Sequence, residues 1–62
     1  MFAIDTIVKF ANPADAVEAD ERFKILEMRG DRVLVEMTGN AFDTWTIKPT
    51  TVYLATDLME VL

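Results

Sequence analysis

Two apolar segments flank the tripeptide Arg29-Gly30-Asp31, and this pattern restricts the fold of the chain more than any other. Residues 23–28 precede the tripeptide, and residues 32–37 follow it. Apolar segments that are joined by a short turn with glycine predict a β-hairpin, in which Gly30 adopts the positive φ of a primed turn. The alternation along the second segment places three side chains on one face of its strand: Val33, Val35 and Met37.

The rest of the chain also favours short strands. Residues 3–10 alternate with a period of two and contain β-branched side chains, as is typical of a strand. Further strands are predicted at residues 42–47 and 52–54, and a last short strand at residues 59–62. Residues 55–58 are predicted to form a single helical or 3-10 turn.

One short helix is predicted in the long connection that follows the first strand. Asn12 is a favoured N-cap residue, Pro13 is favoured at the first helical position, and Asp15 can reach back as in a capping box. The helix is therefore expected to run from Pro13 to about Asp20. Its apolar stripe is thin, so we expect it to lie over one end of a sheet.

The length of the chain limits how these strands can be arranged. Sixty-two residues, of which 52% are hydrophobic, allow one small domain with a core of its own. About five short strands are too few for a sandwich, but they can form one strongly bent sheet that closes on itself. We therefore expect a mainly β protein with a single barrel domain over residues 1–62, and with Met37, Trp45 and Ile47 in its core.

The order of these elements resembles that of the SH3-like small barrels of bacteria. The resemblance is carried by Phe2-Ala3-Ile4 leading into Ile7-Val8-Lys9-Phe10, by the hairpin segment 26–36, and by Ile47-Lys48-Pro49-Thr50 running to Asp57-Leu58. It covers nearly the whole chain and implies an SH3-like barrel of about five strands with one short helix in the first long loop. The same residues are similar to a group of small bacterial proteins of uncharacterised function. Such barrels often carry Gly-Asp where this chain has Asp5-Thr6.

Two better-known groups with this architecture imply different activities. The type II dihydrofolate reductases are tetramers that build a shared active site with a Val-Gln-Ile-Tyr stretch. The nearest stretch here is Thr50-Thr51-Val52-Tyr53, in which Thr51 replaces the glutamine. The SH3 domains that bind proline-rich peptides carry an Ala-Leu-Tyr-Asp-Tyr stretch in their first loop. That stretch is missing here, although the first loop is acidic.

The composition excludes several kinds of chemistry within the chain. It contains no histidine, cysteine or serine, so it has no imidazole or thiolate metal ligand, no histidine general base and no serine or cysteine nucleophile. No pair of carboxylates or lysines has a spacing that argues for acid–base catalysis, and the spacing of a calcium loop is missing. We therefore expect no enzyme activity, no cofactor and no metal.

Charge and hydropathy narrow the range of partners and locations. Six basic and eleven acidic residues give a formal net charge of −5, and no basic cluster is present. This composition disfavours binding to nucleic acid. No segment has the pattern of a targeting signal or the apolar length of a membrane span. Together with the absence of cysteine, this predicts a location in the bacterial cytoplasm.

The acidic first loop and two later aromatic residues, which we expect to be exposed, form a candidate partner surface. In barrels of this type the long first loop and the turn before a later strand can lie side by side. Acids beside aromatic rings would suit a peptide that carries Arg or Lys. The alternative is a solvated helix face whose acids lie near the N-terminus for dipole reasons. The candidate surface consists of Asp15, Glu18, Asp20, Glu21, Phe42 and Tyr53.

Two functions therefore stay open. The first is a non-enzymatic interaction module that binds another protein or peptide, or its own copies. The second is a subunit of a homo-oligomer that binds a small molecule between subunits, as the resemblance to the reductases implies. The oligomeric state separates the two, because a chain this short cannot enclose a ligand-sized pocket alone.

Overall fold

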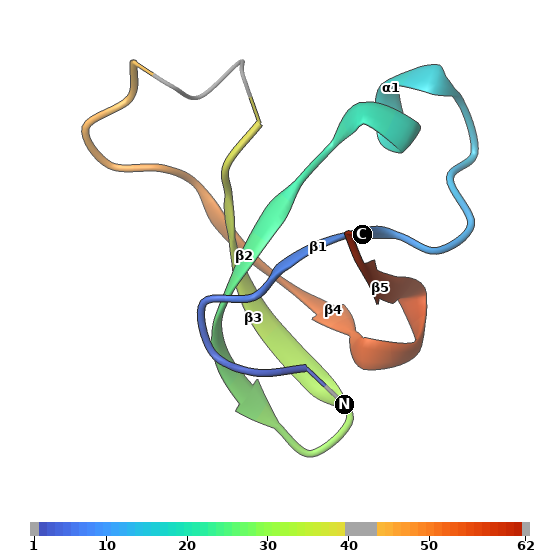
Figure 1. Ribbon diagram of the computed structural model, residues 1–62. Coiled ribbons are helices and arrows are strands. Elements are labelled where there is room, and N and C mark those ends of the chain that lie inside the picture. Colours follow the sequence, from blue (N-terminus) through green and yellow to red (C-terminus); the bar gives the residue numbers. More distant parts are fainter. Residues whose placement is uncertain (1, 40–43, 62) are drawn as a thin grey trace.

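The computed structural model describes residues 2–39 and 44–61. Five antiparallel strands form one sheet in the order β4-β3-β2-β1-β5 (Figure 1), so the prediction of a mainly β protein is confirmed. The end strands β4 and β5 do not pair with each other in the described part of the chain, and the sheet is open. The strands are β1 (Ile7–Phe10), β2 (Phe23–Arg29), β3 (Arg32–Met37), β4 (Thr50–Leu54) and β5 (Leu58–Glu60).

The predicted hairpin is confirmed as β2 and β3. The two strands pair from Phe23 opposite Met37 to Arg29 opposite Arg32, which leaves a two-residue turn. Gly30 has a φ of 61°, whereas Asp31 has no positive φ. A positive φ at only the first of two turn residues is the pattern of a type II′ turn, for which glycine is favoured.

β2 contains a bulge that changes the direction of the strand. Its register against β3 shifts between Ile25 and Glu27, so that one residue of β2 has no counterpart on β3. A bulge bends its strand and increases the local twist. The part of β2 before the bulge also pairs with β1, through Lys24 opposite Ile7 and Phe23 opposite Val8. β2 is therefore the strand that joins the hairpin to the N-terminal segment.

The first strand is shorter than predicted. β1 begins at Ile7 instead of residue 3, because Asp5 has a φ of 72° and lies in the left-handed region that a strand cannot contain. The Asp5 amide donates to the Ile25 carbonyl at 2.8 Å, and the Ile25 amide donates to the Thr6 carbonyl at 3.0 Å. The N-terminal segment therefore turns sharply beside the bulge of β2.

The predicted helix also starts later in the chain. α1 spans Ala16–Asp20, and its N-cap is Asp15, whose Oδ1 accepts from the Glu18 amide at 2.9 Å. The prediction of a start at Pro13, with Asn12 as the cap, is therefore wrong. Asp15 and Glu18 have the spacing of a capping box, and this pair is the stronger start signal.

The core lies between the inward faces of the strands. Tyr53, Phe10 and Phe23 form an aromatic group with ring centroids 5.1–5.3 Å apart, in which Phe23 is fully buried. Met37 is half-buried and packs against the core, as predicted. The alternation predicted for β3 is also confirmed, because both of its core valines are buried. The buried hydrophobic residues are Val8, Phe23, Ile25, Val33, Val35 and Leu58.

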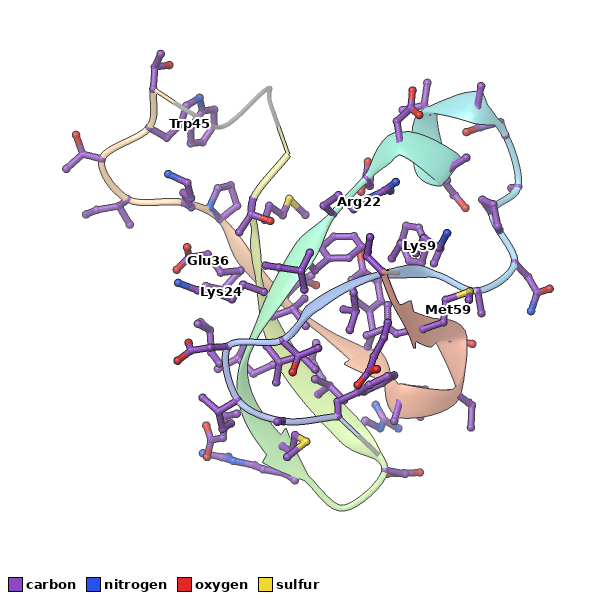
Figure 2. All side chains as sticks on the ribbon, in the orientation of Figure 1. Lys9, Arg22, Lys24, Glu36, Trp45 and Met59 are labelled. Carbon is purple, nitrogen blue, oxygen red and sulfur yellow. The ribbon has the colours of Figure 1, made fainter. Side chains whose placement is uncertain are left out.

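The segment before β4 is not the strand that its sequence predicts. Residues 44–47 form no strand, and the side chains of Trp45 and Ile47 are 50% and 85% exposed, so their placement in the core is wrong. The alternation of residues 44–47 is typical of a strand. These residues do not pair with β3, because β3 already pairs with β2 on one side and with β4 on the other. Figure 2 shows Trp45 on a connection that extends away from the sheet.

The end of the chain follows its prediction closely. A 3-10 turn, η2 (Ala55–Asp57), connects β4 to β5, and this confirms the single turn predicted there. β5 begins at Leu58, one residue earlier than predicted, and pairs with β1. Leu58 is buried, so the short last strand contributes to the core.

Candidate interaction surface

The acids of the candidate surface lie on α1 and at its two ends. Asp15 caps the helix, and Glu18 folds back so that its Oε1 accepts from the Ala14 amide at 3.0 Å. Two of the four acids therefore satisfy backbone N–H groups at the start of a short helix. Asp20 is exposed, and Glu21 is half-buried.

Arg22 compensates part of this negative charge. Its Nη1 donates to the Ala19 carbonyl at 2.9 Å and to the Glu21 carbonyl at 2.8 Å. The guanidinium thus binds carbonyl groups at the C-terminal end of α1, where a positive charge is favourable. These contacts support the simpler interpretation of the acidic segment, in which its charges stabilise the helix. Whether the segment also binds a partner stays a prediction.

Tyr53 is not the exposed aromatic residue that the sequence predicts. Its side chain is half-buried, and its ring contacts Phe10 and Phe23, because Tyr53 faces the core side of β4. Burial raises the pKa of Tyr53 above its ordinary value, and the negative charges of Glu21 and Glu18 raise it further. The structure therefore brings two of the predicted acids near Tyr53, but the ring is mostly covered. Phe42 lies outside the described residues.

A second surface, separate from the predicted candidate surface, lies on the outer face of β2, β3 and β4. Along β4 the side chains alternate, with Thr50, Val52 and Leu54 exposed on this face. Val52 is 52% exposed and lies opposite Leu34 of β3, while Leu54 is 38% exposed. We call the apolar residues Leu34, Val52 and Leu54 the outer apolar strip.

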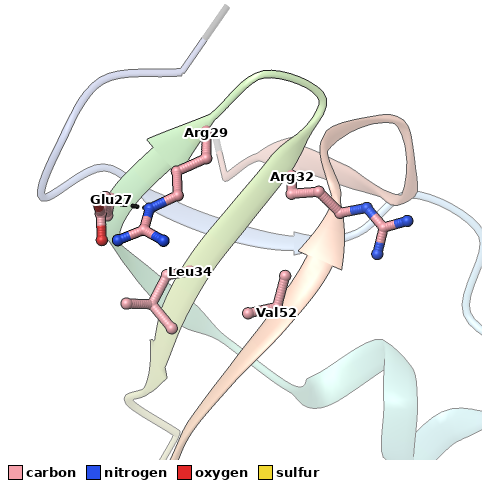
Figure 3. A pocket seen from close by; sticks show the side chains of 5 residues that line it. All are labelled: Glu27, Arg29, Arg32, Leu34 and Val52. Carbon is pink, nitrogen blue, oxygen red and sulfur yellow. Dashed lines mark hydrogen bonds and ion pairs between the residues drawn. The ribbon is translucent and has the colours of Figure 1, made fainter.

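A shallow hollow of about 140 Å³ lies over this strip (Figure 3). Leu34 and Val52 form its apolar part, and the two arginines lie on its two sides. Arg29 Nε donates to Glu27 Oε1 at 2.8 Å, and this hydrogen bond raises the pKa of Arg29. Arg32 Nε is 3.9 Å from Asp31 Oδ1, so its ion pair is much looser. The hollow is lined by Glu27, Arg29, Arg32, Leu34 and Val52.

β4 is also an end strand, and the backbone groups of three of its five residues point away from the sheet. The Met37 amide donates to the Pro49 carbonyl at 2.9 Å, and the Ala55 amide donates to the Asp31 carbonyl at 2.8 Å. Hydrogen-bonded pairs alternate in an antiparallel ladder, so the odd-numbered residues of β4 bond to β3. The N–H and C=O groups of Thr50, Val52 and Leu54 therefore point toward the free edge, where no described residue pairs with them.

The sequence held a partial signal for this surface. The strand predicted at residues 52–54 lies within β4, and the alternation along residues 32–37 puts Leu34 on the face opposite Val33 and Val35. Local patterns do not show which strand forms the edge of a sheet, because strand order depends on pairing between distant segments. The free edge of β4 therefore became visible only in the folded chain.

The described residues contain no group of three or more acidic side chains that could hold a metal ion. No helix among residues 2–39 and 44–61 has the length and apolar character needed to cross a bilayer. No protein family model, curated protein or solved structure matches this chain.

Proposed function

We propose that the protein is a non-enzymatic interaction module with an SH3-like arrangement, and that its β4 edge binds an extended strand of a partner protein. The observation that carries this proposal is the row of backbone groups on Thr50, Val52 and Leu54 that pair with no strand among residues 2–39 and 44–61, next to the outer apolar strip. In strand addition, main-chain hydrogen bonds supply affinity and side chains on the sheet face supply specificity.

The SH3-like part of the proposal is supported by topology. The strand order β4-β3-β2-β1-β5 and the 3-10 turn between β4 and β5 agree with the resemblance drawn from the sequence. The bulge in β2 lets the first part of this strand pair with β1 while the whole strand pairs with β3. A strand shared in this way is what a small bent barrel requires.

The two ends of the sheet differ in how well they are protected against pairing. β5 has only three residues, and it carries the charged Glu60 among its outward-facing backbone positions. β4 has five residues, no charged side chain and no proline within it. Proteins usually protect edge strands with charges, prolines or short length, so an unprotected edge indicates a place where another strand binds.

The variant Val52→Pro tests the proposal. It removes an outward N–H that makes no bond to β3, so the fold loses no ladder hydrogen bond. A strand bound at the edge, however, loses the hydrogen bond that the Val52 N–H would donate to it. Val52→Thr is the matched control, because it keeps the N–H and the β-branched shape. Peptides selected from a display library of extended heptamers should bind the wild type and the control. Their affinity for Val52→Pro should fall at least tenfold.

The same experiment can contradict the proposal. Thermal melting of Val52→Pro must first show a folded domain with a midpoint close to that of the control. If the selected peptides then bind Val52→Pro as tightly as the wild type, the β4 edge is not the binding site. If the library yields no binder to the wild type, strand addition by a partner peptide is rejected.

The hollow beside Arg29 and Arg32 favours a second candidate function. The loosely paired guanidinium of Arg32 beside an apolar floor suits a small anionic molecule, whereas Arg29 is already bonded to Glu27. The hollow is well below the ~300 Å³ of ordinary ligand pockets, so a second subunit would have to enclose it. Light scattering combined with size-exclusion chromatography would show whether a stable oligomer exists. A thermal-shift screen with nicotinamide and folate cofactors would then test for the ligand class that the reductases imply.

A further inference from the structure

We infer that the strand bound at the β4 edge is β4 of a second copy of this chain, arranged around a two-fold axis at Val52. The inference rests on the proposed function of this edge and specifies its partner. It follows from the length of β4, from the direction of its free backbone groups and from the apolar side chains that this register brings together.

The length of β4 selects one register. An antiparallel two-fold pairing centred on Val52 places Thr50 opposite Leu54 of the second copy and so pairs all five residues. Because the N–H and C=O of Val52 point outward, the two copies of this residue would form a hydrogen-bonded pair. A register centred on any other residue leaves part of the strand without a partner. Among two-fold pairings of two copies, only this register satisfies the whole row of free groups on β4.

The outer apolar strip becomes continuous in this register. Leu34 lies opposite Val52 in one copy, and Val52 lies beside Val52 of the second copy, so four apolar side chains form one row. β-branched side chains in cross-strand contact stabilise a sheet. The two shallow hollows also come together, because Val52 lines each of them.

The charges along the edge do not oppose the same register. Arg32 lies opposite Leu54, and Glu36 lies opposite Thr50. When Leu54 pairs with Thr50 of the second copy, Arg32 and Glu36 of the second copy occupy the two ends of one cross-strand row. The same pair occurs again on the other side of the two-fold axis. Three strand spacings, about 14 Å, separate the two charges of a row, so they form no ion pair, but the register brings no like charges into contact. Figure 3 shows Arg32 extending toward the β4 side of the sheet.

The expected dimer is weak. A five-residue edge buries far less area than the ~1,200 Å² that a stable interface requires, and two copies of net charge −5 repel each other at a distance. The monomer and the dimer should therefore exchange, and the dimer should be populated at high concentration. Sedimentation of the wild type should show this association, and Val52→Pro should sediment as a monomer.

Single cysteines test the register directly, because the chain contains no cysteine of its own. Paired residues in an antiparallel ladder have Cα atoms about 5.5 Å apart, within the range that a disulfide spans. Val52→Cys should therefore form a disulfide-linked dimer in a glutathione redox buffer. Leu54→Cys and Thr50→Cys should not do so alone, since each residue lies more than ~13 Å from its own copy. An equimolar mixture of these two variants should form the mixed dimer.

Ile47→Cys serves as the collision control, because this side chain is 85% exposed and lies outside β4. Val52→Cys should be cross-linked at least tenfold faster than Ile47→Cys. Equal rates for the two variants would overturn the inference, as would a mixture of Leu54→Cys and Thr50→Cys that forms no mixed dimer.

The outcome also separates this inference from the proposed function. A wild type that stays monomeric at every concentration, but binds peptides that Val52→Pro does not bind, overturns the dimer and keeps strand addition. A wild type that neither associates nor binds peptides overturns both.

Discussion

Two residues of the described chain have a positive φ, and they differ in how easily they adopt it. Gly30, at 61°, has no Cβ and occupies the first position of the hairpin turn at little cost. Asp5, at 72°, belongs to a residue type that tolerates this region better than most others. Glycine would adopt this φ at lower cost than Asp5, because it has no Cβ.

Replacing Gly30 with a β-branched residue should destabilise the domain through its backbone. A Cβ at Gly30 would meet no atom within 4 Å, so the cost of Gly30→Val comes from φ and not from a steric clash. We expect a loss of about 1–2 kcal/mol in the free energy of unfolding, measured by urea denaturation. Gly39→Ala is the control, because Gly39 has open space and no positive φ. Equal stability of both variants would contradict the II′ turn.

The alkaline titration of Tyr53 should report the acids of the helix. The chain has one tyrosine, so the absorbance of its phenolate belongs to this residue alone. Its pKa is raised in the folded state by burial and by Glu21 and Glu18, so ionisation favours the unfolded chain. Stability should therefore decrease as the pH rises above the unfolded value of about 10 and through the folded value.

A charge-neutral variant separates the causes of this shift. Glu21→Gln should lower the titration midpoint of Tyr53 while the fold is kept, because it removes the larger of the two charge effects. Asp31→Asn is a control at the far end of the hairpin and should leave the midpoint unchanged. A midpoint that is the same in Glu21→Gln and the wild type would show that Glu21 does not act on Tyr53.

At the scale of elements, β4 combines two different roles in five residues. Its residues Thr51 and Tyr53 bond to β3 and face the core side, while Thr50, Val52 and Leu54 face the outside with both side chain and backbone. Thr51 and Tyr53 thus hold the strand to β3, whereas Thr50, Val52 and Leu54 are left to contact another molecule. Both proposals depend on this alternation.

Hydrogen exchange of the β4 amides checks this alternation. In dilute solution the amides of Val52 and Leu54 should exchange rapidly, because they point to solvent. The amides of Thr51 and Tyr53 should be protected by their bonds to β3. Nuclear magnetic resonance can follow each amide separately. Protection of Val52 in dilute solution equal to that of Tyr53 would mean that the edge is covered within the monomer.

At the scale of the whole molecule, the core is small and centred on one aromatic residue. Phe23 is fully buried, contacts the rings of Phe10 and Tyr53, and lies on the strand that connects β1 to β3. A domain of this size has a total stability of only ~3–9 kcal/mol. Loss of one large core side chain is therefore comparable to the whole stability.

The variant Phe23→Ala should leave the domain largely unfolded at room temperature. Removal of a buried phenylalanine costs about 3–5 kcal/mol, from lost transfer energy and from the cavity that remains. Circular dichroism and one-dimensional proton spectra would measure the folded fraction. Ile47→Ala removes a side chain that is 85% exposed and should not change the melting temperature. A cooperative melt of Phe23→Ala close to that of Ile47→Ala would contradict the position of Phe23 in the core.

The features that the sequence predicted correctly depend on neighbours along the chain. The hairpin around Gly30, the buried alternation of Val33 and Val35, and the 3-10 turn at Ala55–Asp57 each follow from a local pattern. The residue types that favour a turn and the alternation of side chains along a strand involve only a few neighbouring residues. They can therefore be recognised in the sequence alone. The helix was predicted in the correct connection, and the Asp15–Glu18 capping pair would have given its start as well.

The features that the sequence did not predict depend on contacts between distant segments. The segment 44–47 has the alternation of a strand but does not join the sheet, where β4 already occupies the edge of β3, so Trp45 and Ile47 stay outside the core. Asp5 turns out of the strand because its amide bonds to Ile25, twenty residues later. Tyr53 is covered because folding brings it against Phe10 and Phe23. The free edge of β4, on which both proposals depend, likewise exists only once β3 has paired on its other side, because hydrogen bonding between strands is decided by the whole sheet.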